Sequence, residues 1–513
     1  MNVLFISIDS LRRDFLSAYR DTPYGLDYEV ETPNLDRFAD RAVTFETHYV
    51  GSLPCMPARR EWLAGVQEFL WRPWGPMEAF DQPLAELARS AGAVSQLITD
   101  HYHYFQHGSH GYYEDFTGFE FVRGHEYDAW QTAPRDPDQR LYDQSADQRA
   151  DPPHDPGYVN RSAYARNGAR LGIADPEAAE SDFFGPRVFA RTADWLAENR
   201  EWNQWFCYVD SFDVHEPFHC PEPYASMYTD EDPADPDLPF WPYYGPVDAG
   251  QSALTYRELA FVQSQFAGKV TMVDRWFGDV LDTLDENGLW DETAVIVTSD
   301  HGFFLGEHGW VGKNEPPVYD VLSRTPLFVH LPDSPQLGES VDALTSAVDL
   351  YPTILDLLDI EVPEWTHGTS LHSLLSGETE SHRDWALYGY WGSSLNVTDG
   401  RYTYLCPIDP SEPSYCYSTT MMNPRRHFTP LEPKMEAVAG SYLPYTKTPV
   451  WRYKGASYEQ NGVPLLFDSE RDPEQTTNLA ETDGDRHRDL RQLLTDALDD
   501  LSAPTWQYER LAQ

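Results

Sequence analysis

Carboxylates and imidazoles follow four short apolar runs of this sequence. They are Asp9 after 3–8, His101 and His103 after 94–98, Asp210, Asp213 and His215 after 205–209, and Asp300 and His301 after 294–298. Carboxylate oxygens bind hard cations such as calcium or magnesium, and an added imidazole nitrogen also suits manganese or zinc. We expect these side chains to meet in one metal-dependent active site. For a single residue such as Asp9, the competing interpretation is a helix cap.

The stretch 298–313 reads TSDHGFFLGEHGWVGK and combines Asp300 and His301 with His308 and Lys313. Lys313 is one of only five lysines, and its compact ammonium group could neutralise an anionic oxygen of a substrate. The alternative is a capped turn with incidental charges. The density of His, Asp, Gly and Lys in this stretch favours a functional site.

Cys55 is the third candidate for chemistry. It opens a predicted helix close to Arg59 and Arg60, in the stretch LPCMPARREWLAG. A helix N-terminus and neighbouring guanidinium groups lower the pKa of a thiol, so we expect a nucleophile or a modification site. A lone cysteine is otherwise a small buried apolar residue.

Helical patterns separate the apolar runs and predict how these side chains are positioned. They cover 33–40, 83–91, 186–198 and 257–287, and a further apolar run lies at 327–330. Apolar strands that alternate with helices indicate a mostly parallel sheet covered on both faces. In such α/β folds ligands bind beyond the carboxyl ends of the strands, where the candidate residues lie.

The pattern of apolar and polar residues changes near residue 375. Alternating patterns and the turn at 398–400 predict antiparallel strands, and a final helix is expected at about 485–501. We therefore predict a catalytic α/β domain over 1–375 and a smaller α+β subdomain over 376–513. The Asp- and Pro-rich stretches 123–182 and 221–250 are expected to be long surface loops with little regular structure.

The chain of 513 residues is strongly acidic, with 84 Asp and Glu against 37 Lys and Arg and a formal net charge of -47. This balance argues against nucleic acid and anionic membranes as partners. A content of 41% hydrophobic and 14% aromatic residues argues against disorder. Scarce lysine within an acidic composition is typical of halophiles, where molar salt shortens the Debye length to roughly 3 Å. We expect thermal stability to rise steeply with KCl; a melting temperature that stays flat would contradict this.

The five cysteines are widely spaced and odd in number, which supports neither a disulfide scaffold nor a structural zinc site. A bridge between Cys406 and Cys416 is disfavoured in a reducing compartment. The opening residues lack a signal-peptide pattern, and no stretch has the roughly 20 apolar residues of a membrane span, so the expected location is the cytoplasm. The oligomeric state stays open.

Taken together, these motifs resemble the sulfatase family. Cys55, Pro57 and Arg59 have the form of its C-x-P-x-R signature, and TSDHG, LGEHG and GK look like its metal and substrate site. The segments IDSLRRD, TPNLDRFA, VDLYPTILDLL, HGTSL and LFDSERDPEQTTNL are similar to family landmarks, in order from residue 3 to about 480. The resemblance implies the alkaline-phosphatase-like fold.

The resemblance also implies roles for individual residues. Cys55 would be oxidised to formylglycine by a formylglycine-generating enzyme, and Arg59 would steady it. Asp9, Cys55, Asp300 and His301 would hold one divalent cation, calcium first, with manganese or magnesium as alternatives. Lys313, His215 and His103 would contact the sulfate or its leaving oxygen. The substrate would be a small-molecule or saccharide sulfate ester, and Trp71, Trp74, Trp130 and Trp241 are candidates to stack on a sugar.

Three positions depart from the family pattern. Ser10 follows Asp9 where many sulfatases have a second aspartate, His101 stands where many have a lysine, and Gly302 replaces an asparagine. A single aspartate at the first strand also resembles the phosphonate monoester hydrolases and phosphodiesterases of the same superfamily, which are the alternative. A catalytically inert sulfatase-like binding protein is the third hypothesis.

Overall fold

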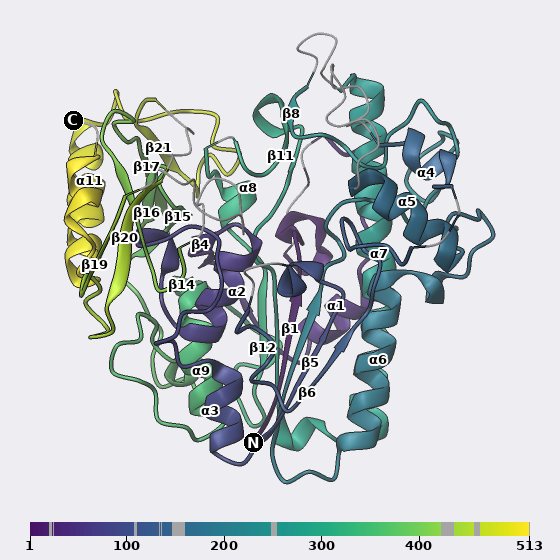
Figure 1. Ribbon diagram of the computed structural model, residues 1–513, viewed down its shortest axis with the longest axis horizontal. Helices are drawn as coiled ribbons and strands as arrows, with labels where there is room; N and C mark the ends of the chain where they lie inside the picture. Colours follow the sequence, from purple (N-terminus) through teal and green to yellow (C-terminus); the bar gives the residue numbers. More distant parts are fainter. Residues whose placement is uncertain are drawn as a thin grey trace.

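The computed structural model is shown in Figure 1. It describes residues 1–19, 23, 25–106, 110–132, 134, 136–145, 160–247, 254–315, 317–421, 436–455 and 462–511. Within these ranges no helix combines the length and the apolar character needed to cross a bilayer.

An eight-stranded sheet forms the centre of the molecule. Its order is β13 (Ser340–Val341), β2 (Val43–Phe45), β12 (Leu327–His330), β9 (Thr293–Thr298), β1 (Asn2–Ile8), β7 (Trp205–Ser211), β5 (Val94–Thr99) and β6 (Gly118–Phe121). The five strands from β9 to β6 are parallel, whereas β12 runs antiparallel to both of its neighbours. The predicted mixed, mostly parallel sheet is confirmed, and so are all five predicted strands.

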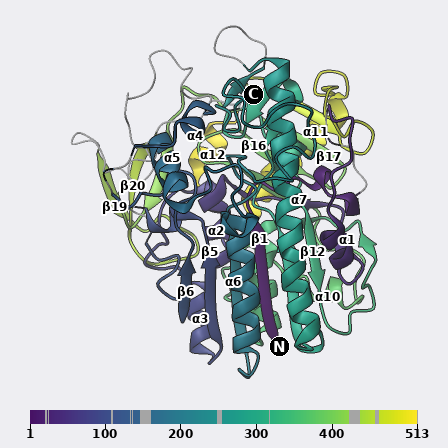
Figure 2. The same ribbon diagram turned by 90° about the vertical axis from the view of Figure 1, so that its right-hand side faces the viewer.

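Helices cover both faces of this sheet (Figures 1 and 2). One face packs against α1 (Pro33–Ala39), α6 (Phe184–Asn199) and α7 (Tyr256–Glu286), and the other against α2 (Cys55–Ala64), α3 (Leu84–Ser90) and α9 (Leu350–Leu357). Strand β1 shows why two layers are needed. Leu4 and Ile6 belong to the first core and Val3 and Phe5 to the second, because successive side chains of a strand point to opposite faces.

A smaller sheet dominates the C-terminal part of the chain. Its order is β21 (Leu465–Asp468), β17 (Tyr402–Cys406), β16 (Leu395–Thr398), β15 (Ala386–Tyr390) and β4 (Ser52–Leu53), and α11 (Gly484–Asp500) packs against it. All its pairings are antiparallel except that of β15 with β4. The predicted antiparallel sheet and final helix are therefore present. Strand β4 immediately precedes Cys55, so the C-terminal sheet reaches the candidate site; the boundary at 375 stays a prediction.

The prediction of little regular structure over 123–182 is wrong for part of that stretch. Helices α4 (Gln139–Asp143) and α5 (Asn160–Leu171) lie there, although residues 146–159 fall outside the described residues. Tyr164 and Ala165 of α5 are buried in the core that also contains the apolar residues of α7. Tertiary packing thus stabilises a helix that the Asp- and Pro-rich surroundings concealed. The stretch 221–247 consists mainly of turns, as expected, and 248–250 lie outside the described residues.

Candidate active site

Helix α2 places Cys55 at the carboxyl edge of the central sheet. Cys55 is its first residue and is 2% exposed. Arg59 lies one turn further along, on the same face, because residues four apart are neighbours on a helix. Its Nη1 donates to the carbonyl oxygen of Cys55 at 3.2 Å. The C-x-P-x-R spacing therefore delivers one thiol and one guanidinium group to a single point.

Three buried carboxylates surround the Arg59 guanidinium group. Asp210, near the end of β7, accepts from Nε at 3.1 Å and from Nη2 at 2.8 Å. Asp9 Oδ2 lies 2.9 Å from Nη2, and Asp300 pairs with Nη1. Asp9, Asp210 and Asp300 come from three parallel strands in adjacent positions, and so the sheet itself assembles the cluster.

The Cys55 thiol lies between an imidazole and an ammonium group. Its Sγ is 3.3 Å from His301 Nε2 and 3.4 Å from Lys313 Nζ. Lys313 Nζ also lies 3.5 Å from Ser10 Oγ and 3.9 Å from Asp9 Oδ1. Six of the residues predicted for the site are thus in contact with one another: Asp9, Cys55, Arg59, Asp300, His301 and Lys313.

The position of Lys313 depends on two other parts of the chain. It follows β11 (Trp310–Gly312), and Tyr390 of β15 donates a hydrogen bond to its backbone carbonyl. Gly312 has a φ of +119°, and a Cβ there would lie 2.6 Å from the Tyr244 ring. Only glycine fits this close approach. The C-terminal sheet therefore helps to position the lysine.

The donor set fits a divalent cation. Ligand atoms of Asp9, Cys55, Asp300 and His301 all lie within 4.8 Å of one another. His301 Nδ1 donates to the Gly302 carbonyl at 2.9 Å, which leaves Nε2 as the atom with a lone pair toward Cys55. Asp9 Oδ2 is buried and, within the described part of the chain, accepts no well-aligned hydrogen bond, although it is ion-paired with Arg59.

Two of the three departures from the sulfatase pattern have structural explanations. Ser10 Oγ donates to Asp9 Oδ1 at 2.8 Å and its amide donates to Asp300 Oδ1 at 3.0 Å, so this residue orients two carboxylates rather than adding a third. A Cβ on Gly302 would lie 1.8 Å from the Val321 carbonyl oxygen, which excludes an asparagine there. Asn314 instead lines the same cavity as Cys55.

The expected low pKa of the Cys55 thiol is wrong. Burial and the negative charges of Asp9 and Asp300 raise this pKa well above its usual value, and Lys313 and Arg59 offset only part of the rise. The second arginine of the motif contributes nothing, because Arg60 points elsewhere and pairs with Asp81 and Glu68. The residues near Cys55 in the sequence predicted a pKa shift in the wrong direction, because the carboxylates that raise the pKa follow strands distant in the sequence.

The other titratable groups of the cluster differ in the direction of their pKa shifts. Burial and the neighbouring Asp300 raise the pKa of Asp9, whereas Arg59, His301 and Lys313 overcome burial and lower that of Asp300. Burial lowers the pKa of His301 to about 3, so its imidazole is neutral. The thiol and the carboxylates keep the pKa of Lys313 above its usual range despite burial. A neutral imidazole and an anionic carboxylate are the protonation states that metal binding requires.

A cavity of about 690 Å³ opens onto Cys55 and Lys313. His103 and His215 both line it, and so do Trp74 and Trp241. Burial, with the nearby charge of Lys313, lowers the pKa of His215 well below its usual value. Its Nδ1 donates to the Glu216 carbonyl at 2.7 Å. Trp71, by contrast, is buried in the C-terminal core.

Residues 1–360 match a protein-family model whose description is Sulfatase. The chain belongs to the sulfatase family. Membership in this family makes it a hydrolase and accounts for the order of its motifs along the sequence.

Relatives of this sulfatase-family chain extend over most of its length. It is 28% identical over 432 residues to the multifunctional alkaline phosphatase superfamily protein PehA of Trinickia caryophylli, covering 75% of this chain and 78% of that protein. It is 26% identical over 386 residues to the uncharacterized sulfatase YidJ of Escherichia coli K12, covering 72% and 70%. The crystal structure of the phosphonate monoester hydrolase of Agrobacterium radiobacter shares the fold, with a TM-score of 0.64, 21% identity and coverage of 98% and 95%.

Several residues that line this cavity escaped prediction. Glu126 and Glu216 line the cavity beside His215, and Tyr102 and Tyr244 form part of its wall. Glu126 lies in the stretch predicted to be a loop, where nothing in the local sequence marks it. Glu216 directly follows His215, and this adjacency is the one signal that could have identified it.

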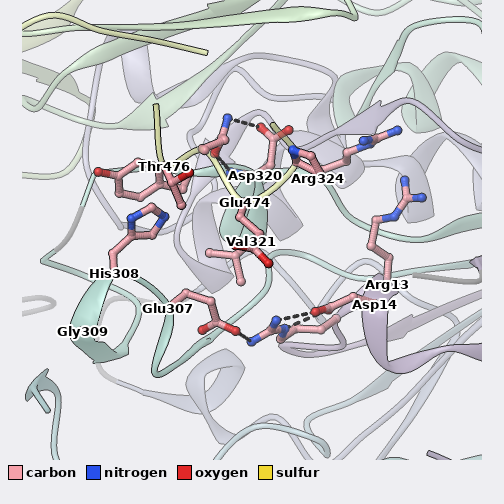
Figure 3. A pocket seen from close by; sticks show the side chains of 14 residues that line it. Arg13, Asp14, Glu307, His308, Gly309, Asp320, Val321, Arg324, Glu474 and Thr476 are labelled. Carbon is pink, nitrogen blue, oxygen red and sulfur yellow. Dashed lines mark hydrogen bonds and ion pairs between the residues drawn. The ribbon is translucent and has the colours of Figure 1, made fainter. Parts of the chain in front are cut away.

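Arg12, three residues after Asp9 in the sequence, points away from this site. It pairs with Asp14 and Glu307 and lines a second cavity of about 580 Å³, shown in Figure 3. His308 also lies there, stacked on Tyr319 at a centroid distance of 3.8 Å. The stretch 298–313 therefore contributes Lys313 to one cavity and His308 to the other.

Proposed function

We propose that this protein hydrolyses a small-molecule or saccharide sulfate ester, using a formylglycine derived from Cys55 and one divalent cation. The observation that supports this most is the meeting of Cys55 with Asp9, Asp300, His301 and Lys313 in one buried cluster at the base of a cavity. The expected product is inorganic sulfate.

The raised pKa of Cys55 supports conversion of the thiol before catalysis. A thiol held neutral by burial and neighbouring carboxylates is a poor nucleophile. Oxidation by a formylglycine-generating enzyme would replace the sulfur with an aldehyde, whose hydrate offers a nucleophilic oxygen at the same position. Arg59 holds the backbone of this residue through its carbonyl oxygen.

Asp9, Asp300, His301 and residue 55 would hold the cation. When bound, it would lower the pKa of the nucleophile and bind one sulfate oxygen. Two carboxylates favour a hard cation, calcium first with magnesium as an alternative, and the imidazole nitrogen keeps manganese as a further alternative. Arg59 already pairs with both carboxylates, and its positive charge favours their ionised forms.

Lys313 and the two cavity histidines would contact the sulfuryl oxygens and the leaving group of the ester. The Lys313 ammonium group, 3.4 Å from Cys55 Sγ, would neutralise charge on the sulfuryl oxygens. His215 presents Nε2 as an acceptor while Nδ1 donates to Glu216, and protonating the leaving oxygen would first require Nε2 to take up a proton. His103 lies on the same wall and would contact the substrate there.

The second candidate is a phosphodiesterase or phosphonate monoester hydrolase. The presence of Ser10 in place of a second aspartate favours it, and so does similarity to a phosphonate monoester hydrolase and a multifunctional superfamily protein. Both candidates act on monoanionic esters, which suits a site with only Arg59, Lys313 and one cation. A dianionic phosphate monoester would need more positive charge.

Two measurements test the proposal. Peptide mass spectrometry on the Cys55 peptide should show loss of the thiol and gain of an aldehyde; unmodified cysteine in fully active enzyme would reject the nucleophile. A panel of nitrophenyl sulfate, phosphonate and phosphodiester substrates should then show fastest cleavage of the sulfate. Much faster phosphodiester cleavage would favour the second candidate.

A further inference from the structure

Negative charge exceeds positive charge around the active-site cavity. Seven charged side chains lie at its base or on its walls: the carboxylates Asp9, Asp210, Asp300, Glu126 and Glu216, and the cations Arg59 and Lys313. A bound divalent cation offsets charge at the base, where it would contact Asp9 and Asp300. That cation would not neutralise Glu126 and Glu216, which lie on the cavity wall.

Glu126 and Glu216 come together from two distant segments. Glu126 follows β6, Glu216 follows β7, and their side chains are 6% and 3% exposed. Their carboxylate oxygens and a ring nitrogen of His215 lie within 4.8 Å of one another. Two carboxylates this close and this buried repel each other and lose hydration, so the free energy of the pair is high unless a positive charge is supplied.

The partners of the two carboxylates leave one oxygen of each unsatisfied. Tyr244 donates to Glu216 Oε1, and Tyr102 interacts with the Glu126 carboxylate. Oε2 of both residues accepts no hydrogen bond from any described residue. His103 Nε2 is 3.7 Å from Glu126 Oε2. His215 Nδ1 is 3.3 Å from Glu216 Oε2, but its proton goes to the Glu216 carbonyl.

The pKa values agree with an unmet need for positive charge. Burial and then the charge of Glu216 raise the pKa of Glu126 well above its usual value, and burial raises that of Glu216. Lys313 offsets this only from a distance, because its Nζ is within 4 Å of Cys55, Ser10 and Asp9. A cation placed between the two carboxylates would lower both pKa values.

Aromatic rings complete this part of the cavity. Its walls include Trp74, Tyr102, Tyr127, Trp241, Tyr243 and Tyr244. The faces of such rings attract cations, and the attraction is strongest when the cation is desolvated. Carboxylates and aromatic rings that line the same wall form the combination that recognises ammonium groups.

We propose that this wall binds a positively charged group on the alcohol portion of the ester, so that the substrate is a zwitterionic sulfate ester. The proposal rests on the sulfatase activity proposed above. The sulfate would lie at the base, near Lys313 and Arg59, and the ammonium group would lie between Glu126 and Glu216. The cavity of about 690 Å³ has room for both ends of a small aminoalcohol or aminosugar ester.

A matched pair of esters tests the charge alone. 2-(Trimethylammonio)ethyl sulfate and 3,3-dimethylbutyl sulfate have the same shape and differ by a nitrogen cation in place of a carbon. We expect kcat/KM for the cationic ester to be at least about tenfold higher, which corresponds to about 1.4 kcal/mol. 2-Aminoethyl sulfate against propyl sulfate repeats the comparison with a smaller cation. Equal or faster cleavage of the neutral ester in both pairs would overturn the proposal.

Variants locate the effect in the structure. In Glu126→Gln and Glu216→Gln the ratio of the two kcat/KM values should fall toward one. Glu292→Gln is the control, because it removes the same charge from an exposed position before β9, at the opposite end of that strand from Asp300, and should keep the ratio. A ratio that survives both cavity substitutions, or a second equivalent of divalent metal that is lost with them, would contradict an organic cation here.

A final arm separates this proposal from the proposed sulfatase activity. Nitrophenyl sulfate carries no ammonium group, so its cleavage measures the sulfatase activity by itself. Inactivity toward every sulfate ester would refute the proposed function but not the cation-binding wall. The charge ratio is then measured on nitrophenyl phosphodiesters that carry the same trimethylammonioethyl and dimethylbutyl groups. A ratio near one there would refute the cation-binding wall as well.

Discussion

Two buried clusters of this molecule contain nearly the same side chains and differ in what surrounds them. The catalytic cluster combines Asp9, Asp300 and His301 with Lys313, Arg59 and Cys55. The second cluster combines Asp100, Asp213 and His125 with Lys269, and none of these four lines the active-site cavity. Both arise at the carboxyl ends of strands, so composition and position in the fold do not separate them.

The lysine explains the difference between them. Lys269 pairs with Asp213 and donates to the carbonyls of His215 at 3.1 Å and Pro217 at 2.7 Å, so it satisfies the backbone on both sides of Glu216. Asp213 and Asp100 accept the amides of Gly185 and Phe212. Lys313 instead lies beside the thiol and lines the active-site cavity. A cluster whose lysine binds a carboxylate and the backbone stabilises the chain, whereas one whose lysine lines a cavity beside a reactive side chain can contact a substrate.

The largest effect is expected from the nucleophile position. Cys55→Ala should lower kcat by at least about 10³-fold, because nothing else in the cluster can supply the attacking oxygen. The melting temperature should stay within a few degrees. Cys406→Ala is the matched control, since Cys406 is equally buried but belongs to the C-terminal core. A comparable loss in the control would mean that the wrong cysteine was chosen.

Removal of the cation should affect only the catalytic cluster. Chelation, checked by metal analysis, should abolish turnover, and calcium should restore it. Asp300→Asn should abolish turnover without rescue, because it removes a ligand and a partner of Arg59. Full activity of protein shown to be free of metal would refute a cation at Asp9, Asp300 and His301.

Exchange of the two lysines for methionine separates catalysis from stability. Lys269→Met leaves Asp213 charged and unpaired, so the free energy of unfolding should fall by about 3–5 kcal/mol. Lys313→Met should lower kcat/KM by about 10²–10³-fold with a smaller change in stability. Urea denaturation and steady-state kinetics on both variants measure this. The reverse pattern would exchange the roles assigned to the two clusters.

Mild acid should weaken both clusters by a smaller amount. Burial lowers the pKa of His301 to about 3 and also lowers that of His125. Because unfolded histidines titrate near about 6.5, the unfolded chain binds protons first as pH falls, and the free energy of unfolding decreases. His301 contributes about 1 kcal/mol between about pH 6.5 and 5.5, and His125 contributes in the same direction. Urea midpoints at pH 7.5 and 5.5 test this, and His125→Gln should reduce the difference; a midpoint that rises in acid would contradict it.

Local patterns predicted much of the fold. The five apolar runs are strands in the structure, and the predicted helices correspond to α1, α3, α6, α7 and α11. These elements are predictable because burial of a strand or of one helix face produces a regular spacing of apolar residues. Helix α5 was missed, since its stability comes from packing rather than from its own composition. Whether the -47 charge reflects life in salt stays a prediction.

The sequence by itself determined which side chains could do chemistry: the Cys55 to Arg59 motif and the strand-end residues Asp9, Asp300 and His301. Each of them is marked by its immediate neighbours in the sequence, so it is visible without a structure. The tertiary structure alone decided that Asp210 joins Arg59, that the thiol pKa rises, and that Glu126 meets Glu216 on the cavity wall. Each of these depends on charges brought together from distant strands, and electrostatic energies follow distance in space rather than separation in sequence.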